Sequence, residues 1–443
     1  MYLLKGMSKK RKLLLWLGLL TGIVAVLATI LFMFASRYIN SEPVQNNIRK
    51  IVTQHLGKTV TYQRAYLSIF PLPGLAFSQV VITIPRKAAI SAQSVSIYPA
   101  LLPLLTGKVR LAKLKLEAPD ITIDIPEKSQ QEKQAKPSSF KEKVDDIDSV
   151  ISSLRTAVPG LVCVLQRGKL LVREAGHKAI TAQDINVRIA LVSTGIEISF
   201  KGDVGRWGGI SARGKFYTEG NNILINDLSV STGKSSASIF VAKLRLKDKP
   251  ILEIESGKAV LIFDDIYERR SLLESLYDPL LKIKKLKGVV KVESLKLSGE
   301  LLHPEKWIIQ TEGSVQDIDV DVSELPSPVK IERGQFQANG STLTLSNVRA
   351  SIFDSSFTAS AVMSGSAQAI DSANVAMSGN IGPETVRRVS KIFQLPPEQT
   401  VRAPLSISNA HLIWQARSNL AITGIAAIQN GPTISLDLRK YDE

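Results

Sequence analysis

Most of the chain alternates apolar and polar residues, which is the pattern of β-strands that bury one face and expose the other. Clear examples are the stretches 75–84, 121–125, 180–191 and 196–200. Stretches with helical spacing are few by comparison. The pattern therefore predicts a mainly β protein.

One motif recurs along these strands. Two apolar residues separated by one residue are followed by two intervening residues and then by a second such apolar pair. In a regular strand the two pairs would face opposite sides of the sheet, because side chains alternate with a period of two. One inserted residue, as in a β-bulge, returns both pairs to the same side and bends the strand. Repeated bulges predict a curled sheet with one continuous apolar face.

The motif occurs nine times in the chain. A single copy could be a coincidence in an apolar, β-rich chain, whereas nine copies support a curled sheet. Its apolar positions are Leu75, Phe77, Val80, Ile82; Ile90, Ala92, Val95, Ile97; Val109, Leu111, Leu114, Leu116; Ile180, Ala182, Ile185, Val187; Ile223, Ile225, Leu228, Val230; Ile239, Val241, Leu244, Leu246; Val290, Val292, Leu295, Leu297; Leu343, Leu345, Val348, Ala350; and Leu405, Ile407, Ala410, Leu412.

Helices are predicted at only a few places, namely 44–56, 144–158, 264–281 and 384–393. A β-sandwich would need a second sheet over the apolar face, and these helices could cover only part of it. We therefore expect an elongated, curled and bulged antiparallel β-sheet whose apolar face forms a groove. Such a groove suits extended acyl chains. The candidate lipid-contact residues are Leu75, Phe77, Val80, Ile82, Val109, Leu111, Leu114, Leu116, Ile239, Val241, Leu244, Leu246, Val290, Val292, Leu295 and Leu297.

Residues 13–34 carry no charge and are long enough, as a helix, to cross a bilayer. The apolar run exceeds that of a signal peptide, and no small-residue cleavage site follows it. Five basic residues lie within 5–12, which by the positive-inside rule places residues 1–12 in the cytoplasm. We expect a single-pass inner-membrane protein whose bulk lies in the periplasm.

The charge balance adds little to this picture. Lys and Arg number 56 against 40 Asp and Glu, a formal charge of +16. The basic residues are spread singly along strands, as at Lys243, Lys291 and Lys296, and aromatics make up only 6%. Nucleic-acid binding would favour a concentrated basic patch with aromatics. The lysines indicate a solvated strand face or, as the alternative, attraction to anionic lipid headgroups.

The sequence contains no complete catalytic or metal-binding motif. Cys163 is the single cysteine and the four histidines are scattered, so neither a disulfide nor a Cys-based zinc site is expected. Residues 232–235 (TGKS) lack the upstream glycine of a P-loop, and Asp317, Asp319 and Asp321 alternate with aliphatics as on a strand. We expect no enzyme activity, no cofactor and no metal. The weakest alternative is a periplasmic hydrolase, and it would need a cluster of ionisable groups in a pocket.

The same features predict the domain organisation. After the cytoplasmic segment (1–12) and the membrane span (13–34), an N-terminal β-groove module covers 38–126. A polar, Lys/Glu/Gln-rich linker follows at 127–143. Further β-groove repeats cover 144–258, 259–370 with its helix at 264–281, and 371–443, where no atypical capping unit of the kind that ends a repeat array is evident, as in a truncated repeat.

The stretch from the anchor to about Ile125 resembles the AsmA family of bacterial envelope proteins. The residues that carry the resemblance are a helix ending in Leu56-Gly57-Lys58, the segment 70–75 (FPLPGL), the turn 101–109 (LLPLLTGKV), and the ending 114–123 (LKLEAPDITI). The later chain is similar to the repetitive middle of that family by pattern only.

The resemblance implies a repeating periplasmic β-groove anchored in the inner membrane and related to bridge-like lipid-transfer proteins. It implies phospholipid movement toward the outer membrane, support of outer-membrane integrity, and no catalytic residue. Partners would be membrane phospholipid, and possible periplasmic or outer-membrane proteins. The alternative is a non-transporting periplasmic scaffold or adaptor that assists outer-membrane protein assembly.

Overall fold

The computed structural model describes most of the chain beyond residue 40. The described residues are 37, 41–46, 60–68, 74–84, 88–100, 103, 110–125, 149, 152–153, 155–174, 179–246, 249–268, 283–301, 303, 306–322, 327–365, 370–392, 394, 404–416, 419–428 and 433–441.

The chain divides into two compact units. Unit 1 comprises Met1–Gln134 and Arg155–Ala190, and unit 2 comprises Ala135–Leu154 and Leu191–Glu443. The predicted membrane span at 13–34 and the linker at 127–143 lie outside the described residues. Among the helices that are described, none combines the length and the apolar character needed to cross a bilayer.

Unit 1 is built from short and then longer strands. They are β1 (Val60–Thr61), β2 (Arg64–Ser68), β3 (Gly74–Ile84), β4 (Ala88–Pro99), β5 (Leu111–Ile125), β6 (Val162–Glu174) and β7 (Ile180–Val192), whose last two residues belong to unit 2. β1 and β2 both pair antiparallel with β3, which pairs with β4, and β4 pairs with β5.

One strand pair of unit 1 departs from the expected antiparallel sheet. β5 and β6 are parallel, whereas β6 and β7 are again antiparallel. A parallel neighbour requires a crossover connection of a dozen or more residues, and more than thirty residues separate these two strands. The described residues 149, 152–153 and 155–157 in this connection are helical, as predicted for 144–158.

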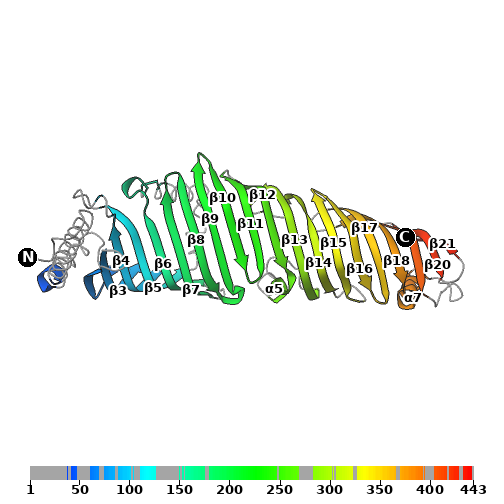
Figure 1. Ribbon diagram of the computed structural model, residues 1–443, viewed down its shortest axis with the longest axis horizontal. Helices are drawn as coiled ribbons and strands as arrows, with labels where there is room; N and C mark the ends of the chain where they lie inside the picture. The colour runs from blue at the N-terminus through cyan, green and yellow to red at the C-terminus, as the bar shows by residue number, and fades with distance from the viewer. Residues whose placement is uncertain are drawn as a thin grey trace, which may run out of the picture. The chain divides into compact units, whose positions relative to one another are not determined.

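Unit 2 is a succession of strands in chain order (Figure 1). From β8 to β21 each strand pairs antiparallel with its neighbour in sequence. The strands are β8 (Gly195–Val204), β9 (Gly209–Glu219), β10 (Asn222–Thr232), β11 (Ser235–Arg245), β12 (Ile251–Ile262), β13 (Ile283–Glu300), β14 (Ile308–Val322), β15 (Val329–Asn339), β16 (Thr342–Ile352), β17 (Ser355–Gly365), β18 (Ile370–Ile381), β19 (Leu405–Gln415), β20 (Asn419–Ile428) and β21 (Thr433–Tyr441).

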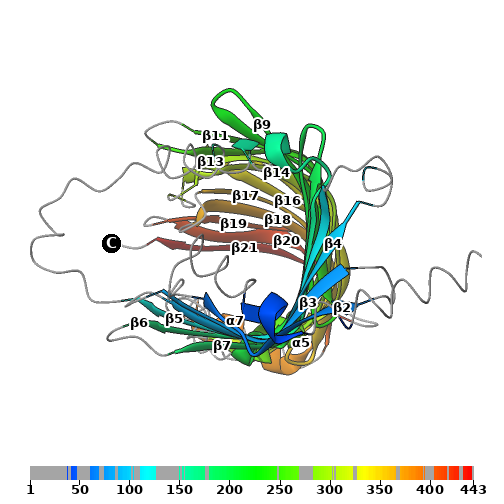
Figure 2. The ribbon, with the colours of Figure 1, turned by 90° about the vertical axis from the view of Figure 1, so that its left-hand side faces the viewer.

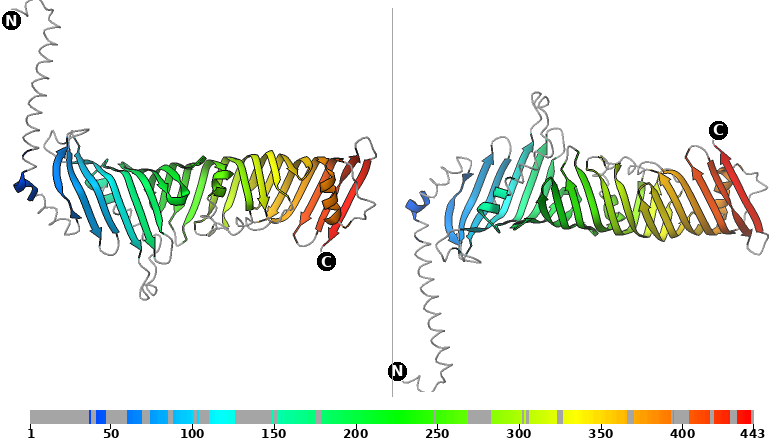
Figure 3. Two further views of the ribbon diagram at one scale, coloured as in Figure 1. Left: turned by 90° about the horizontal axis from the view of Figure 1, so that it is seen from below. Right: turned by 90° about the horizontal axis from the view of Figure 1, so that it is seen from above.

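Helices are few in the described part of unit 2. Between β8 and β21 the helical elements are one 3-10 turn (Gly205–Trp207), α5 (Phe263–Glu268) and α7 (Pro383–Ile392). α7 confirms the helix expected at 384–393, and α5 confirms the start of the one expected at 264–281, whose remainder lies outside the described residues. In Figure 1 both helices lie at the same edge of the strands, and Figure 3 shows α7 beside β18 and β19 from two further sides.

Strands and helices of unit 2 recur at a constant offset. β9, β10 and β11 span 209–219, 222–232 and 235–245, while β15, β16 and β17 span 329–339, 342–352 and 355–365. Each set is followed by one more strand and a helix, α5 at Phe263 and α7 at Pro383. A four-strand and one-helix element thus occurs twice in unit 2, with β13 and β14 between the two copies, which is the kind of internal repetition that repeat architectures show.

Seven of the nine motif copies contain the predicted kink. In five of them the second intervening residue adopts a positive φ near 50°: Gln79, Asp184, Asp227, Asn347 and Asn409. The copy in β4 pairs with the copy in β3, and the strand register between them leaves out Gln79 and Gln93. The copy in β13 has its register shift between Val292 and Ser294. These irregularities place both apolar pairs of a strand on one face.

Two predicted copies were assigned the wrong register. In β5 the positive φ is at Ala118, so the pairs are Leu114, Leu116 and Pro119, Ile121 rather than the set that begins at Val109. In β11 the register shifts lie between Ile239 and Ala242. In both strands a proline or alanine occupies a motif position, and an overlapping set of larger aliphatics matched the pattern better.

The kinks bend the strands, and Figure 2 shows the strands of unit 2 curved so that their sheet is open on one side. All described strands of unit 2 belong to one sheet, and within the described residues no second sheet covers it. Most motif positions of unit 2 are nevertheless buried or half-buried, although Val230 and Val241 are exposed, whereas the residues between them in the correctly registered copies are half-buried or exposed and none is buried. In a single layer, burial of this kind arises where side chains converge on the inside of a bend. We therefore assign the motif residues to the inner face.

Crowding at the kinks supports this assignment. A Cβ on Gly214 would lie 3.1 Å from Leu228 Cδ1, and one on Gly334 would lie 3.0 Å from Val348 Cγ2. Val80, similarly, is paired with Ala92, which is 5% exposed. Large residues thus alternate with glycine or alanine across the strands where the bend brings side chains together.

The kink residues give a direct test of the fold. Replacing Asn347 (φ 52°) with valine should lower the free energy of unfolding by about 1–2 kcal/mol, because a β-branched residue is strained in the left-handed region. Asn347→Gly should cost little. Chemical denaturation measures both. Thr344→Val, on a regular part of the same strand, is the control and should be near neutral; equal losses for the two valine variants would contradict the kink.

Candidate functional site

The inner face of unit 2 carries two apolar clusters. Ala242, Ile254 and Leu297 form one, with Trp307 and Ile309 packed against it. Leu405, Ile407, Ala410 and Ala426 form the other, with Val386 of α7 among its neighbours. Both clusters are small for a sheet of this size. Much of the inner face therefore remains only half-buried in the described residues.

Three of the sixteen candidate lipid-contact residues, namely Val241, Val109 and Leu111, are not placed with the others. Val241 pairs with Asn226 on the opposite side and is 39% exposed, so it was wrongly grouped with Ile239. Val109 lies outside the described residues, and Leu111 lies opposite Pro99 beyond a register shift. In unit 2 the candidates on the inner face are Ile239, Leu244, Leu246, Val290, Val292, Leu295 and Leu297. In unit 1 the candidates Leu75, Phe77, Val80, Ile82, Leu114 and Leu116 share one face of β3 and β5. Whether they contact lipid stays a prediction.

An apolar cavity of about 600 Å³ lies on the inner face between β14 and β18. Trp307, Phe336, Leu343 and Met363 supply most of its apolar wall. The Trp307 indole Nε1 donates a hydrogen bond to the Glu300 carbonyl at 2.7 Å, which fixes the ring at one end of the cavity. We call this space the inner-face cavity.

Polar groups of the inner-face cavity gather at the edge of the sheet. Lys306, Ser341 and Thr342 line that end, next to the turn between β15 and β16. The cavity is thus apolar along the strands and polar at the strand ends. Sequence reasoning identified Leu343 as a motif residue but missed Trp307, Phe336 and Met363, because glycines such as Gly334 interrupt the apolar pattern of the neighbouring strands.

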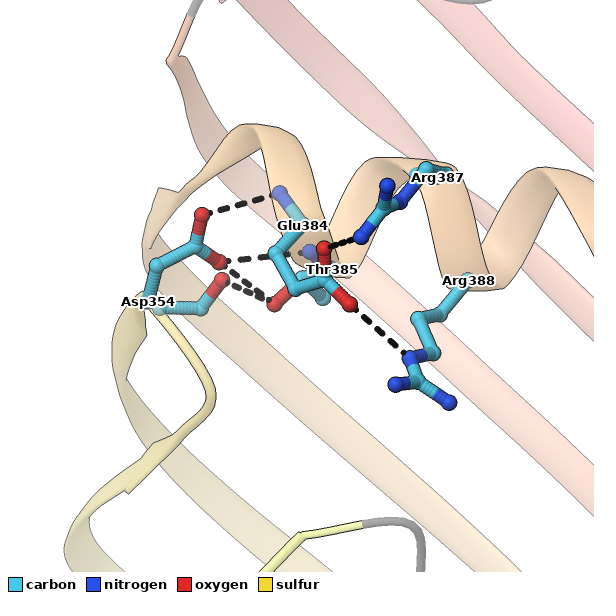
Figure 4. Close-up of polar contacts among 6 residues, drawn as sticks. Asp354, Glu384, Thr385, Arg387 and Arg388 are labelled. Atoms are coloured by element: carbon cyan, nitrogen blue, oxygen red, sulfur yellow. Dashed lines mark hydrogen bonds and ion pairs between the residues drawn. The ribbon is translucent and has the colours of Figure 1, made fainter.

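α7 covers one end of the inner face and is held there by the turn between β16 and β17 (Figure 4). Asp354 accepts hydrogen bonds from the backbone N–H of Glu384 at 2.8 Å and of Thr385 at 3.2 Å. The Gly382 N–H donates to the Ser355 hydroxyl at 2.9 Å. These bonds satisfy orphan donors at the start of the helix. Val386 can then reach the cluster formed by Leu405 and Ile407.

α5 is tied to the sheet at equivalent positions. Asp265 accepts a hydrogen bond from the Lys234 N–H at 2.6 Å, and Asp264 accepts one from the Gly288 N–H at 3.2 Å. Ser235 accepts from the Ile262 N–H, as Ser355 does from Gly382. The TGKS stretch and the paired aspartates therefore serve to dock a helix.

The outer face carries most of the charge. Lys243, Lys291 and Lys296 project from positions that alternate with the inner-face residues of β11 and β13, so they are not at the rim of the groove. Cross-strand ion pairs are frequent here, as between Arg213 and Glu197. Of the two interpretations of the lysines, the outer face favours a solvated strand surface.

Ionisable groups near the kinks have structural roles. Glu117, beside the kink at Ala118, pairs with Lys115 and with Arg167 of β6. The hydrogen bond from Lys115 keeps the pKa of Glu117 below its usual value, and Arg167 adds to this against the opposing effect of burial. Burial raises the pKa of the Cys163 thiol, so it stays neutral and is a poor nucleophile. Within the described ranges no group of His, Cys, Asp and Glu is arranged to hold a metal.

Comparison with known proteins returns no match for this chain among protein-family models, curated proteins or solved structures.

The pH dependence of stability should reveal the Glu117 ion pairs. A lowered folded-state pKa adds stability above the unfolded value, and that stability is lost as the pH falls through the lowered pKa. Glu117→Gln should cost about 1 kcal/mol at pH 7, and the difference from wild type should close as the medium becomes acidic. Asp120→Asn, an exposed carboxyl on the same strand, should cost nothing at either pH. A pH-independent loss at Glu117 would contradict the account.

The anchor of α7 can be tested through Asp354. Asp354→Ala removes two hydrogen bonds from the backbone of the helix start and one from the Thr385 hydroxyl, and it should destabilise α7 by about 1 kcal/mol. Hydrogen exchange should accelerate within 383–392 and spare β13. Asp371→Ala, an exposed carboxyl on β18, is the matched control. Unchanged exchange in α7 would show that Asp354 does not hold the helix.

Proposed function

We propose that this chain binds phospholipid along the inner face of its curled sheet and conducts it between membranes. The observation that carries the proposal is an apolar inner face that no second sheet covers in the described part of unit 2, together with the inner-face cavity of about 600 Å³. An apolar surface left in water is costly, and exposed patches of this kind mark binding sites.

Acyl chains fit this surface better than a compact ligand does. The inner face offers aliphatic and aromatic side chains over successive strands and few polar groups that would orient a small molecule. Each methylene taken out of water is worth about 0.8 kcal/mol, so a chain can be held without specific contacts. Movement along such a surface requires no covalent chemistry, which agrees with the expectation that the protein is not an enzyme.

The cellular setting of the proposal rests on the sequence. The uncharged stretch 13–34 would anchor the chain in the bacterial inner membrane, and the remainder would then lie in the periplasm, as the resemblance to the AsmA family implies. Phospholipid would then pass toward the outer membrane. The scaffold alternative keeps the same anchor and sheet but predicts an inner face that holds no lipid.

Photo-crosslinking at neighbouring residues of β16 separates the two functions. Leu343 lines the inner-face cavity, whereas Thr344 is the next residue and faces the other side of the sheet. A benzophenone amino acid placed at position 343 in the full chain, in cells, should capture phospholipid, which mass spectrometry of the adduct detects. The same group at position 344 should capture little.

The two positions are neighbours on one strand and differ in the face of the sheet to which they belong, so a difference in lipid capture reports the face. Equal lipid capture at 343 and 344 would indicate non-specific contact with membrane. Absence of lipid at both, with each variant correctly folded, would favour the scaffold.

A further inference from the structure

We propose that Arg333 and Arg349 form an anion site on the outer face that binds a phosphate-bearing ligand. Arg333 lies in β15 and Arg349 in β16, and the two residues are directly opposite each other in the strand register. Both side chains are exposed. Like charges that face each other across two strands destabilise a sheet, so this pair needs a compensating interaction.

The other arginines of unit 2 already have such an interaction. Arg213 pairs with Glu197, Arg245 with Glu253 and Arg439 with Asp437, while Arg387 and Arg388 both pair with Glu384. Among the arginines of unit 2 whose side chains are described, Arg333 and Arg349 alone form no ion pair with a carboxylate. Two guanidinium groups are thus available at one place.

The two arginines share a depression of about 630 Å³. It sits where the kink at Asn347 meets the register shifts on either side of Arg333. Gln316, Gln335 and Thr358 also line it and can donate hydrogen bonds. Glu332 lines the depression too, but it forms no ion pair with either arginine, so the two positive charges outnumber one negative charge.

This arrangement fits phosphate better than a carboxylate. Guanidinium groups bind phosphate oxygens in a bidentate manner, and amide and hydroxyl donors can take the remaining oxygens. A phosphate monoester carries about two negative charges near neutral pH, which can neutralise both arginines at once, and a diphosphate carries more. A single carboxylate would neutralise one of them.

The site is separate from the proposed lipid surface. Phe336 and Val348 are inner-face residues, while Arg333 and Arg349 alternate with them on the opposite side of the sheet. A lipid whose chains lie on the inner face cannot present its headgroup here. The phosphate therefore comes from a free phosphate compound or from the headgroup of another lipid, and the inference does not depend on the lipid-carrying function.

Calorimetric titration of the full chain in zwitterionic detergent with inorganic pyrophosphate tests the site. Wild type should bind, and the double variant Arg333→Gln, Arg349→Gln should bind at least about tenfold more weakly. The matched control is Arg213→Gln, Arg245→Gln, which removes the same charge from arginines that are already paired. It should keep wild-type affinity, and circular dichroism confirms that all variants fold.

A parallel titration with dihexanoyl phosphatidic acid distinguishes the sources of the phosphate. A loss confined to the Arg333, Arg349 variant with pyrophosphate supports a free phosphate compound, and the same selective loss with the short lipid supports a headgroup. Equal weakening in both double variants would reveal only general charge attraction and would overturn the site. So would wild-type binding of both probes that is no stronger than that of the Arg333, Arg349 variant.

Discussion

The structure depends on one backbone conformation, a residue at positive φ between two apolar pairs of a strand. Asn347, Asn409 and Asp227 illustrate it, and asparagine and aspartate are among the few non-glycine residues that tolerate the left-handed region. The single extra residue keeps both apolar pairs on one face and bends the strand. Without it a long strand would divide its aliphatic residues between the two faces of the sheet.

The remaining architecture follows from that bend. Bent strands laid side by side produce a curl, and a curl crowds its inner face, which explains why Gly214 and Gly334 stand opposite larger residues at the kinks. α5 and α7 dock at the edge through side-chain hydrogen bonds to helix or turn backbone rather than through a large apolar contact. A single layer of strands can thus hold an apolar surface that is half-buried by its own curvature and available to acyl chains.

The sequence was sufficient to predict the mainly β class, the curl and most kinks. Each bulge inserts one residue between two apolar pairs, so it can be recognised from the spacing of the aliphatic residues. The prediction failed in three strands in which a proline, alanine or glycine occupies a motif position, although alanine at other motif positions, such as Ala182 and Ala410, did not hide the kink. Pro119 hid the kink of β5, Ala242 hid that of β11, and Gly168 hid the kink at Arg167 in β6. Parallel pairing of β5 and β6 and the depression at Arg333 and Arg349 had no local signal, since both arise from which strands become neighbours.

Native mass spectrometry of the full chain, purified from membranes in mild detergent, tests the central claim most directly. The account predicts a protein that carries one or more phospholipid molecules, which charge substitutions at inner-face positions such as Leu295 displace while the fold is retained. A chain that is released without any bound lipid, or that unfolds when Leu295 is charged, would show that the inner face is a sealed core and would contradict the account.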